Sequence, residues 1–105
     1  MINTQRGEVA ISIGGEERVM RLTLGALAAL EEALGSGSMV ELVERFEAST
    51  FRSRDILLLI WAGLNGGGAD VGIDDVGAMS IDGGPLAAAK AGARLLHLTF
   101  GSDPE

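Results

Sequence analysis

The sequence contains no cysteine and no tyrosine, and it has a single tryptophan and a single histidine among its 105 residues. Without cysteine the chain has no disulfides and no thiolate metal sites. One histidine without cysteine is also too poor a ligand set for zinc, which takes four protein or water ligands. Aromatic residues make up only 4% of the chain, so the core must be built from Leu, Ile, Val and Ala. We predict neither a cofactor nor a bound metal.

Basic residues are also scarce. The chain has 8 Lys and Arg against 15 Asp and Glu, which gives a net charge of −7 and argues against binding a nucleic-acid backbone. The longest apolar run, residues 56–64, is less than half of the roughly 20 residues that a membrane helix needs. Residues 1–6 lead into a polar strand and do not resemble a signal peptide. We therefore expect a soluble cytoplasmic protein without nucleic-acid or membrane partners.

The chain is nonetheless rich in apolar side chains. They make up 47% of it, which predicts a folded protein, and the length suits one small domain, residues 1–105. Near the start, Val9, Ile11 and Ile13 alternate with other residues, and Gly14-Gly15 is a two-residue turn signal. Residues 6–22 are therefore predicted to form a β-hairpin. Its apolar face is expected to lie on the first helix, because an isolated hairpin is marginal in water.

The stretch from Leu22 to Gly35 predicts the helix around which the rest is organised. Thr23 can cap its first turn, and Gly35 can supply the left-handed residue that ends it. Leucines recur every three or four residues and predict one buried stripe. The members of the stripe are Leu24, Leu27, Leu30 and Leu34.

Three further helices and a short helical piece are predicted downstream. The second helix spans about 39–48, with a capping box of Ser38 and Glu41; the third spans 54–64, capped by Ser53; the last spans 85–100 and ends at Gly101. Asp74 can cap a short piece at 75–79. The expected inner residues are Val40, Val43 and Phe46 in the second helix, and Leu86, Ala89, Ala93, Leu96 and Phe100 in the last. The fold class is thus α+β, mostly helical: a hairpin (6–22), about four helices (23–101) and a tail (102–105).

The third predicted helix is apolar on every side. Such a helix is either central in the core or carries a face that meets another chain. One helix in so small a domain is hard to cover all round, so both alternatives stay open, and self-association is a third possibility for the same surface. The apolar candidates for partner binding are Leu57, Leu58 and Trp61, with Leu95 and Leu98 in the last helix.

Glu31 is the one charged residue predicted to fall within the stripe of the first helix. A carboxylate there must pair with a cation or lie where the stripe reaches solvent. One interpretation is a structural ion pair with Arg18, Arg21, Arg52 or Arg54; the alternative is a polar contact with a binding partner.

Several patterns that could indicate catalysis do not hold together. His97 is the only histidine, no G-x-S-x-G sequence accompanies it, and a partly exposed helical residue is expected. Gly66-Gly67-Gly68 is not followed by the lysine of a phosphate-binding loop, so loop glycines are expected. The acids at 70, 74, 75 and 82 do not have the spacing of a calcium loop and are interpreted as solvated loop acids. We expect that the protein is not an enzyme.

A set of motifs extends along nearly the whole chain: residues 6–9, Gly14-Gly15, 22–35, Arg45-Phe46, Phe51, Arg54-Asp55, 62–64, 66–68 and Leu95-Leu96. This set resembles the small tail proteins of gene transfer agent clusters in alphaproteobacteria. These proteins are relatives of phage tail assembly chaperones and are sometimes labelled tail tube proteins. The resemblance implies a tail assembly chaperone of a gene transfer agent or prophage that binds the tape-measure protein and possibly other tail proteins. The alternative is a minor structural tail component that is retained in the particle.

Overall fold

The computed structural model describes residues 6–35 and 39–100, and it confirms a hairpin followed by helices. A short helix, Ile73–Gly77, lies in the stretch where a helical piece was predicted, so the described chain has one helix more than the four longer ones. The predicted cap at Ser38, the stop at Gly101, the tail 102–105 and the start of the chain lie outside the described residues. In chain order the elements are β1 (Val9–Ile13), β2 (Glu16–Met20), α1 (Leu24–Leu34), α2 (Met39–Glu47), α3 (Ser53–Gly66), α4 (Ile73–Gly77) and α5 (Gly84–Phe100).

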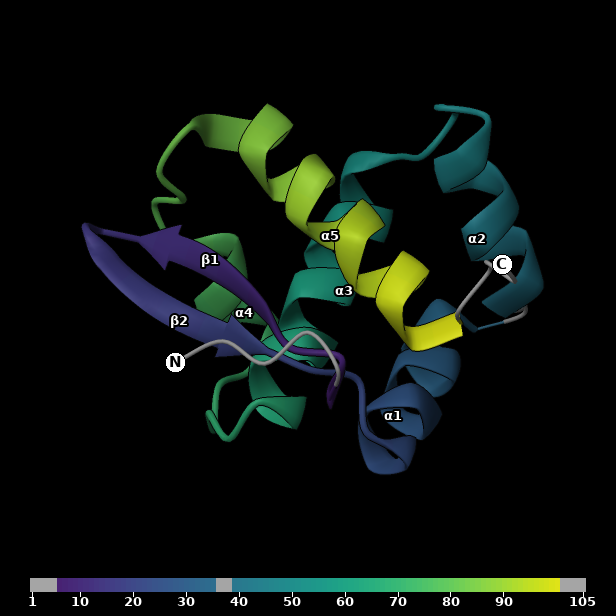
Figure 1. Ribbon diagram of the computed structural model, residues 1–105, viewed down its shortest axis with the longest axis horizontal. Helices are drawn as coiled ribbons and strands as arrows, with labels where there is room; N and C mark the ends of the chain where they lie inside the picture. The colour runs from purple at the N-terminus through teal and green to yellow at the C-terminus, as the bar shows by residue number, and fades with distance from the viewer. Residues whose placement is uncertain (1–5, 36–38, 101–105) are drawn as a thin grey trace.

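The hairpin forms as the sequence predicts. Strands β1 and β2 are antiparallel, with Val9 opposite Met20. Gly14 and Gly15 have φ values of 59° and 84°, the positive values that a tight two-residue hairpin turn requires. The apolar face of the hairpin packs mainly against α3 and α5, not against the first helix as expected, because β2 runs beside the end of α3 and β1 lies under α5 (Figure 1).

Helix α1 begins and ends as predicted. The Thr23 hydroxyl accepts a hydrogen bond of 3.1 Å from the Ala26 N–H, and Gly35 ends the helix with a φ of 74°. The predicted stripe is wrong at one position, because Leu24 is 85% exposed whereas Leu30 is fully buried. Leu24 lies about 160° around the helix from Ala26, which faces the core beside Leu30.

Helix α3 is the centre of the molecule. Helices α1, α4 and α5 and strand β2 all pack against it, and Figure 1 shows α5 crossing in front of it. The all-round apolar sequence is therefore explained largely by burial inside this chain. Its buried apolar residues are Leu58, Leu59, Ile60, Ala62, Gly63 and Leu64.

Glycines at the end of α3 allow the hairpin to approach. A Cβ atom on Gly66 would lie 1.8 Å from the carbonyl oxygen of Arg21, and one on Gly67 would lie 2.1 Å from that of Val19. The Arg21 N–H also donates a 2.9 Å hydrogen bond to the carbonyl of Gly63. The loop after α3 begins later than predicted, because Gly66 is still helical. Gly66 and Gly67 are therefore not only loop glycines: they allow the backbone of the hairpin to pack closely against the helix.

The inner faces of α2 and α5 differ from the predicted ones. In α2 Leu42 is buried, while Val40 is 66% exposed. In α5 Leu86 is 67% exposed, because the helix turns its small residues toward α3: a Cβ atom on Gly92 would lie 3.0 Å from the Leu59 side chain. The buried residues of α5 are Ala88, Ala89, Ala91, Gly92, Leu95 and Leu96, so Ala93 and Phe100 were also assigned wrongly to the inner face.

Within the described residues, no helix combines the length and the apolar character needed to cross a membrane.

Candidate functional site

An apolar groove lies between α3, α4 and the start of α5. Its volume is about 490 Å³. Apolar grooves of this kind are where small soluble proteins commonly receive a ligand or a partner segment. The residues that line it are Ser53, Arg54, Ile56, Leu57, Ile60, Val76, Gly77, Met79, Ile81, Gly84, Pro85 and Ala88.

The floor of the groove belongs to the core, and its walls reach solvent. Ile60 is fully buried and Val76 is 4% exposed, whereas Leu57 and Met79 are half-buried. Arg54 and Ser53 supply its polar residues at the start of α3 and are exposed. The apolar walls and the single charged residue favour an apolar occupant over a polar small molecule.

An ion pair holds the end of α3 that borders the groove. Asp55 is 1% exposed, and its carboxylate accepts hydrogen bonds of 2.8 and 2.9 Å from the Arg45 guanidinium of α2 and one of 2.8 Å from the Arg52 N–H. Asp55 therefore performs the capping role that was predicted for Ser53. Burial alone would raise the pKa of Asp55, but the bonds and charges of Arg45 and Arg52 outweigh it and lower this pKa below its ordinary value.

A side-chain network fixes the loop between α3 and α4. The Val71 carbonyl accepts hydrogen bonds from the Trp61 indole N–H, at 3.1 Å, and from the Asn65 amide, at 3.0 Å. The Asn65 amide oxygen accepts in return from the Val71 N–H, also at 3.1 Å. This network positions α4 as one wall of the groove. Sequence reasoning missed Asn65, although an amide at the end of an apolar helix is a usable signal for a local backbone contact.

A second network joins the groove to the hairpin. The Asp82 carboxylate accepts hydrogen bonds from the Ser12 hydroxyl, at 2.5 Å, and from the Gly15 N–H, at 2.9 Å. The bonds from Ser12 and Gly15 lower the pKa of Asp82. Ile81, which lines the groove, pairs with Ile13 in a β-bridge. Asp82 is thus an exposed loop acid, as predicted, and in addition it ties the loop before α5 to the hairpin turn.

Asp75 also has a structural role, as a cap of α4. Its carboxylate accepts a 2.8 Å hydrogen bond from the Gly72 N–H, so the cap is not Asp74 as predicted. Asp74, Asp75 and Asp70 are exposed. His97 is exposed on α5, as expected for a helical surface residue.

The structure separates the predicted partner-binding residues. Leu57 lines the groove. Leu58 and Leu95 are 1% and 0% exposed, so their assignment to a partner surface is wrong, because both side chains fill the core around α3. Trp61 is half-buried, with its ring nitrogen used in the loop network, and Leu98 is half-buried beside His97.

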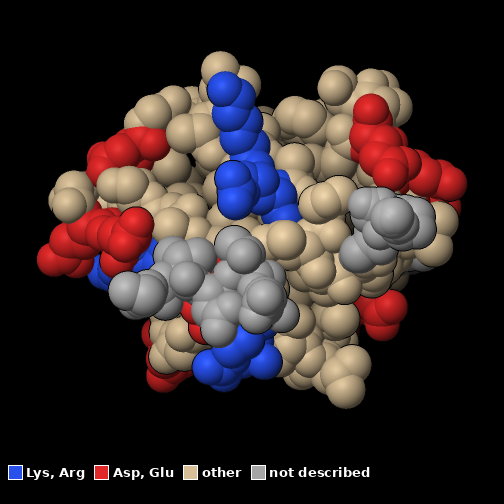
Figure 2. Space-filling model, viewed as in Figure 1, with Lys and Arg blue, Asp and Glu red and all other residues tan. Residues whose placement is uncertain are grey.

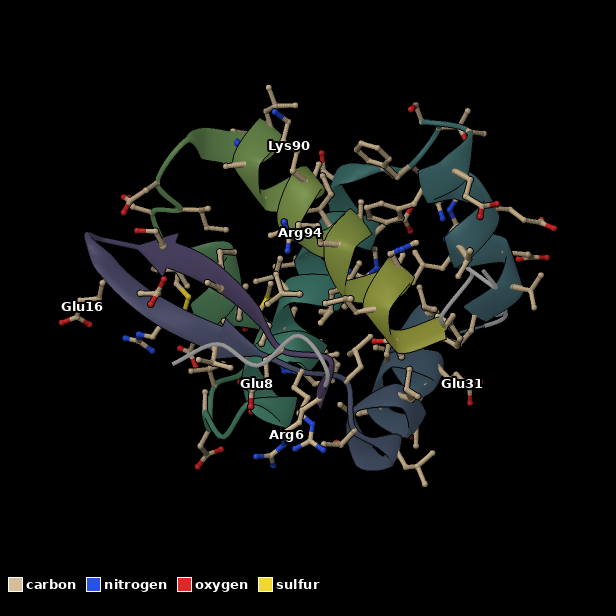
Figure 3. All side chains as sticks on the ribbon, viewed as in Figure 1. Arg6, Glu8, Glu16, Glu31, Lys90 and Arg94 are labelled. Atoms are coloured by element: carbon tan, nitrogen blue, oxygen red, sulfur yellow. The ribbon has the colours of Figure 1, made fainter. Side chains whose placement is uncertain are left out.

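Glu31 does not lie in the apolar stripe. It is exposed on the outer side of α1, and its side chain points away from the molecule in Figure 3. Among the ion pairs of residues 6–35 and 39–100 none includes Glu31, so the predicted ion pair with an arginine is wrong. Its contact with a binding partner stays a prediction.

A family model described as phage tail tube protein, GTA-gp10, matches residues 6–102. No curated protein and no solved structure matches the chain.

Proposed function

The chain belongs to the phage tail tube protein, GTA-gp10 family, and on this premise we propose that it is a structural component of a gene transfer agent tail, retained in the particle. The observation that carries the proposal is the family match, which spans both the hairpin and all the helices. The match confirms the gene transfer agent tail family that the sequence resembles. Membership in a tail family implies contacts with other tail proteins.

The groove beside α3 is the surface we assign to one of these contacts. Its proposed occupant is an apolar segment of a neighbouring tail protein. Leu57 is the main residue of this proposed contact, because it belongs to the central helix and yet remains half-buried at the groove wall. Covering such apolar surface is favourable by roughly 25 cal/mol per Å².

The proposed role is non-catalytic and is exercised in the cytoplasm, where the tail would be assembled. The contacts of three acidic side chains support a non-catalytic role. Each of them holds structural elements in place; they are Asp55, Asp75 and Asp82.

The first experiment is to measure the protein in purified particles. We expect it at a constant ratio to the other tail proteins across independent preparations, measured by quantitative mass spectrometry of intact particles. Its absence from particles that contain complete tails would contradict the structural role.

A variant of the groove tests the proposed contact. Leu57→Ser should fold, because the side chain is half-buried, and it should reduce incorporation into particles by about tenfold through the loss of a well-packed apolar contact. Leu24→Ser is the matched control, since Leu24 is 85% exposed on α1, away from the groove. Equal incorporation of both variants would exclude the groove as a tail contact.

A second candidate, a tail assembly chaperone that binds the tape-measure protein, is favoured by one observation. The described residues contain a single two-stranded sheet, whereas tail tube subunits are typically rich in β-structure. Co-expression separates the two roles. A chaperone would keep an otherwise insoluble tape-measure protein in solution and would be scarce in finished particles; a structural component would be abundant there.

A further inference from the structure

Two cations lie side by side on the outer face of α5. Lys90 and Arg94 are exposed and are separated by one helical turn, which makes them neighbours on the surface. Within residues 6–35 and 39–100 neither of them forms an ion pair. Figure 2 shows basic atoms over α5, with acidic atoms toward the edges of the same face, and Figure 3 labels the two residues. In a chain of net charge −7, this is a distinct basic patch.

The surface around this patch is apolar and hollowed. Leu86 lies one turn before Lys90 and is 67% exposed. A hollow of about 390 Å³ lies between β1 and α5, and a second of about 370 Å³ lies on the other side of Arg94. Exposed aliphatic surface beside free cations is suited to an acidic amphipathic helix.

The outer face of α2 has the matching pattern. Val40 is 66% exposed, Glu44 follows after four residues and Glu47 after seven, and both glutamates are exposed. The order is the same as in Leu86, Lys90 and Arg94: an aliphatic residue, then a charge one turn later, then a second charge two turns later. The charges are opposite, so the two helix faces are complementary when the helices lie parallel.

We propose that the outer face of α2 in one molecule binds the outer face of α5 in a second copy of this chain. Val40 would pack against Leu86, Glu44 would pair with Lys90, and Glu47 with Arg94. Because the two faces are different surfaces of one chain, the contact is head-to-tail and leaves a free α2 and a free α5 at the two ends. Such contacts close into rings or extend into open assemblies.

The contact is expected to be weak in isolated protein. A face of two or three helical turns is at the small end of specific interfaces, and pairs of exposed charges contribute little singly. The association should weaken steeply with salt, since exposed charges are screened beyond about 8 Å at physiological ionic strength. The inference goes beyond the proposed tail role and does not depend on it: it is tested with purified protein alone, whereas the tail role is tested in particles.

The test is a charge exchange followed by sedimentation velocity over a concentration series at low and high salt. The full chain should associate at low salt. Lys90→Glu with Arg94→Glu, and separately Glu44→Lys with Glu47→Lys, should each weaken self-association by about tenfold or more. Mixing the two double variants should restore association, because each then supplies the face that complements the other. Circular dichroism spectra and thermal melts establish that every variant is folded.

The control is Glu16→Lys with Glu17→Lys on β2, which makes the same change in net charge as the α2 variant at another exposed acidic pair. It should leave self-association unchanged. Wild-type protein that stays monomeric at low salt, a control that weakens association equally, or a mixture that fails to associate would each overturn the proposal. If the wild type is monomeric and the Lys90→Glu, Arg94→Glu variant is nevertheless lost from particles, the basic patch binds a different tail protein and not a second copy of this chain.

Discussion

The two ends of α3 are held in different ways. At the C-terminal end, Gly66 and Gly67 lie against the backbone at the end of the hairpin. The carbonyl groups of Arg21 and Val19 leave no room for a side chain at either glycine. At the N-terminal end, Leu57 faces an open groove, and the helix is anchored to α2 by the ion pair between Asp55 and Arg45.

This difference shows how one apolar run can serve two purposes. The hairpin covers the C-terminal half of α3 through backbone contacts, and that half becomes core. The N-terminal half is covered on one side only, because a polar anchor fixes the helix position without burying its outer face. Apolar surface is therefore left uncovered at the N-terminal end of α3, where we propose the tail contact.

Replacing Gly66 should have the largest effect. In Gly66→Ala the new Cβ atom would meet the Arg21 carbonyl oxygen at 1.8 Å, so the hairpin must move away from α3. We expect a loss of about 4 kcal/mol in the free energy of unfolding, above the usual cost of overpacking because a backbone atom has to yield. Urea denaturation measures it.

The matched glycine is Gly25, in α1. Its Cβ atom would approach only the Thr23 hydroxyl, at 3.9 Å, so Gly25→Ala should be neutral or slightly stabilising through helix propensity. Equal unfolding midpoints for the two variants would show that the close approach of hairpin and helix does not limit stability.

Adjacent leucines sharpen the contrast between core and groove. Leu58→Ala should cost about 3 kcal/mol in unfolding free energy, because it leaves a cavity in a fully packed site. Leu57→Ala should cost about 1 kcal/mol, since that side chain is only partly buried and lies at the open groove. Chemical denaturation of both variants checks the ranking, and a larger loss for Leu57 would place the groove wall in the core.

Breaking the polar anchor should have a smaller effect than either Gly66→Ala or Leu58→Ala, and one that depends on pH. Because the pKa of Asp55 is lowered in the folded chain, its contribution is fully present above the unfolded value of about 4 and is lost as the pH falls through the lower folded value. Asp55→Asn should cost about 2 kcal/mol at neutral pH. The difference in unfolding free energy between wild type and Asp55→Asn should shrink on acidification, and a difference that is constant with pH would contradict the assignment.

Part of the candidate site could be predicted from the sequence. The all-round apolar sequence of the third helix left burial and partner contact both open, and Leu57, one of the partner candidates, does line the groove. Leu58 could not be recognised as a core residue in advance, and it was therefore kept among the partner-binding candidates. The reason is that a helix that is apolar all round carries no periodicity to mark its outer side. The loop network of Asn65 depends on a contact with Val71 that composition does not reveal.

The sequence by itself determined the elements and most of their limits. The paired glycines set the hairpin turn, and Thr23 and Gly35 bound α1, because these are local effects of backbone conformation and nearby hydrogen bonds. Only the tertiary structure decided which side of each helix is buried. Leu24 and Leu86 are exposed because helices approach α3 most closely through small residues, and that choice depends on how several helices share one core rather than on the spacing within any one of them.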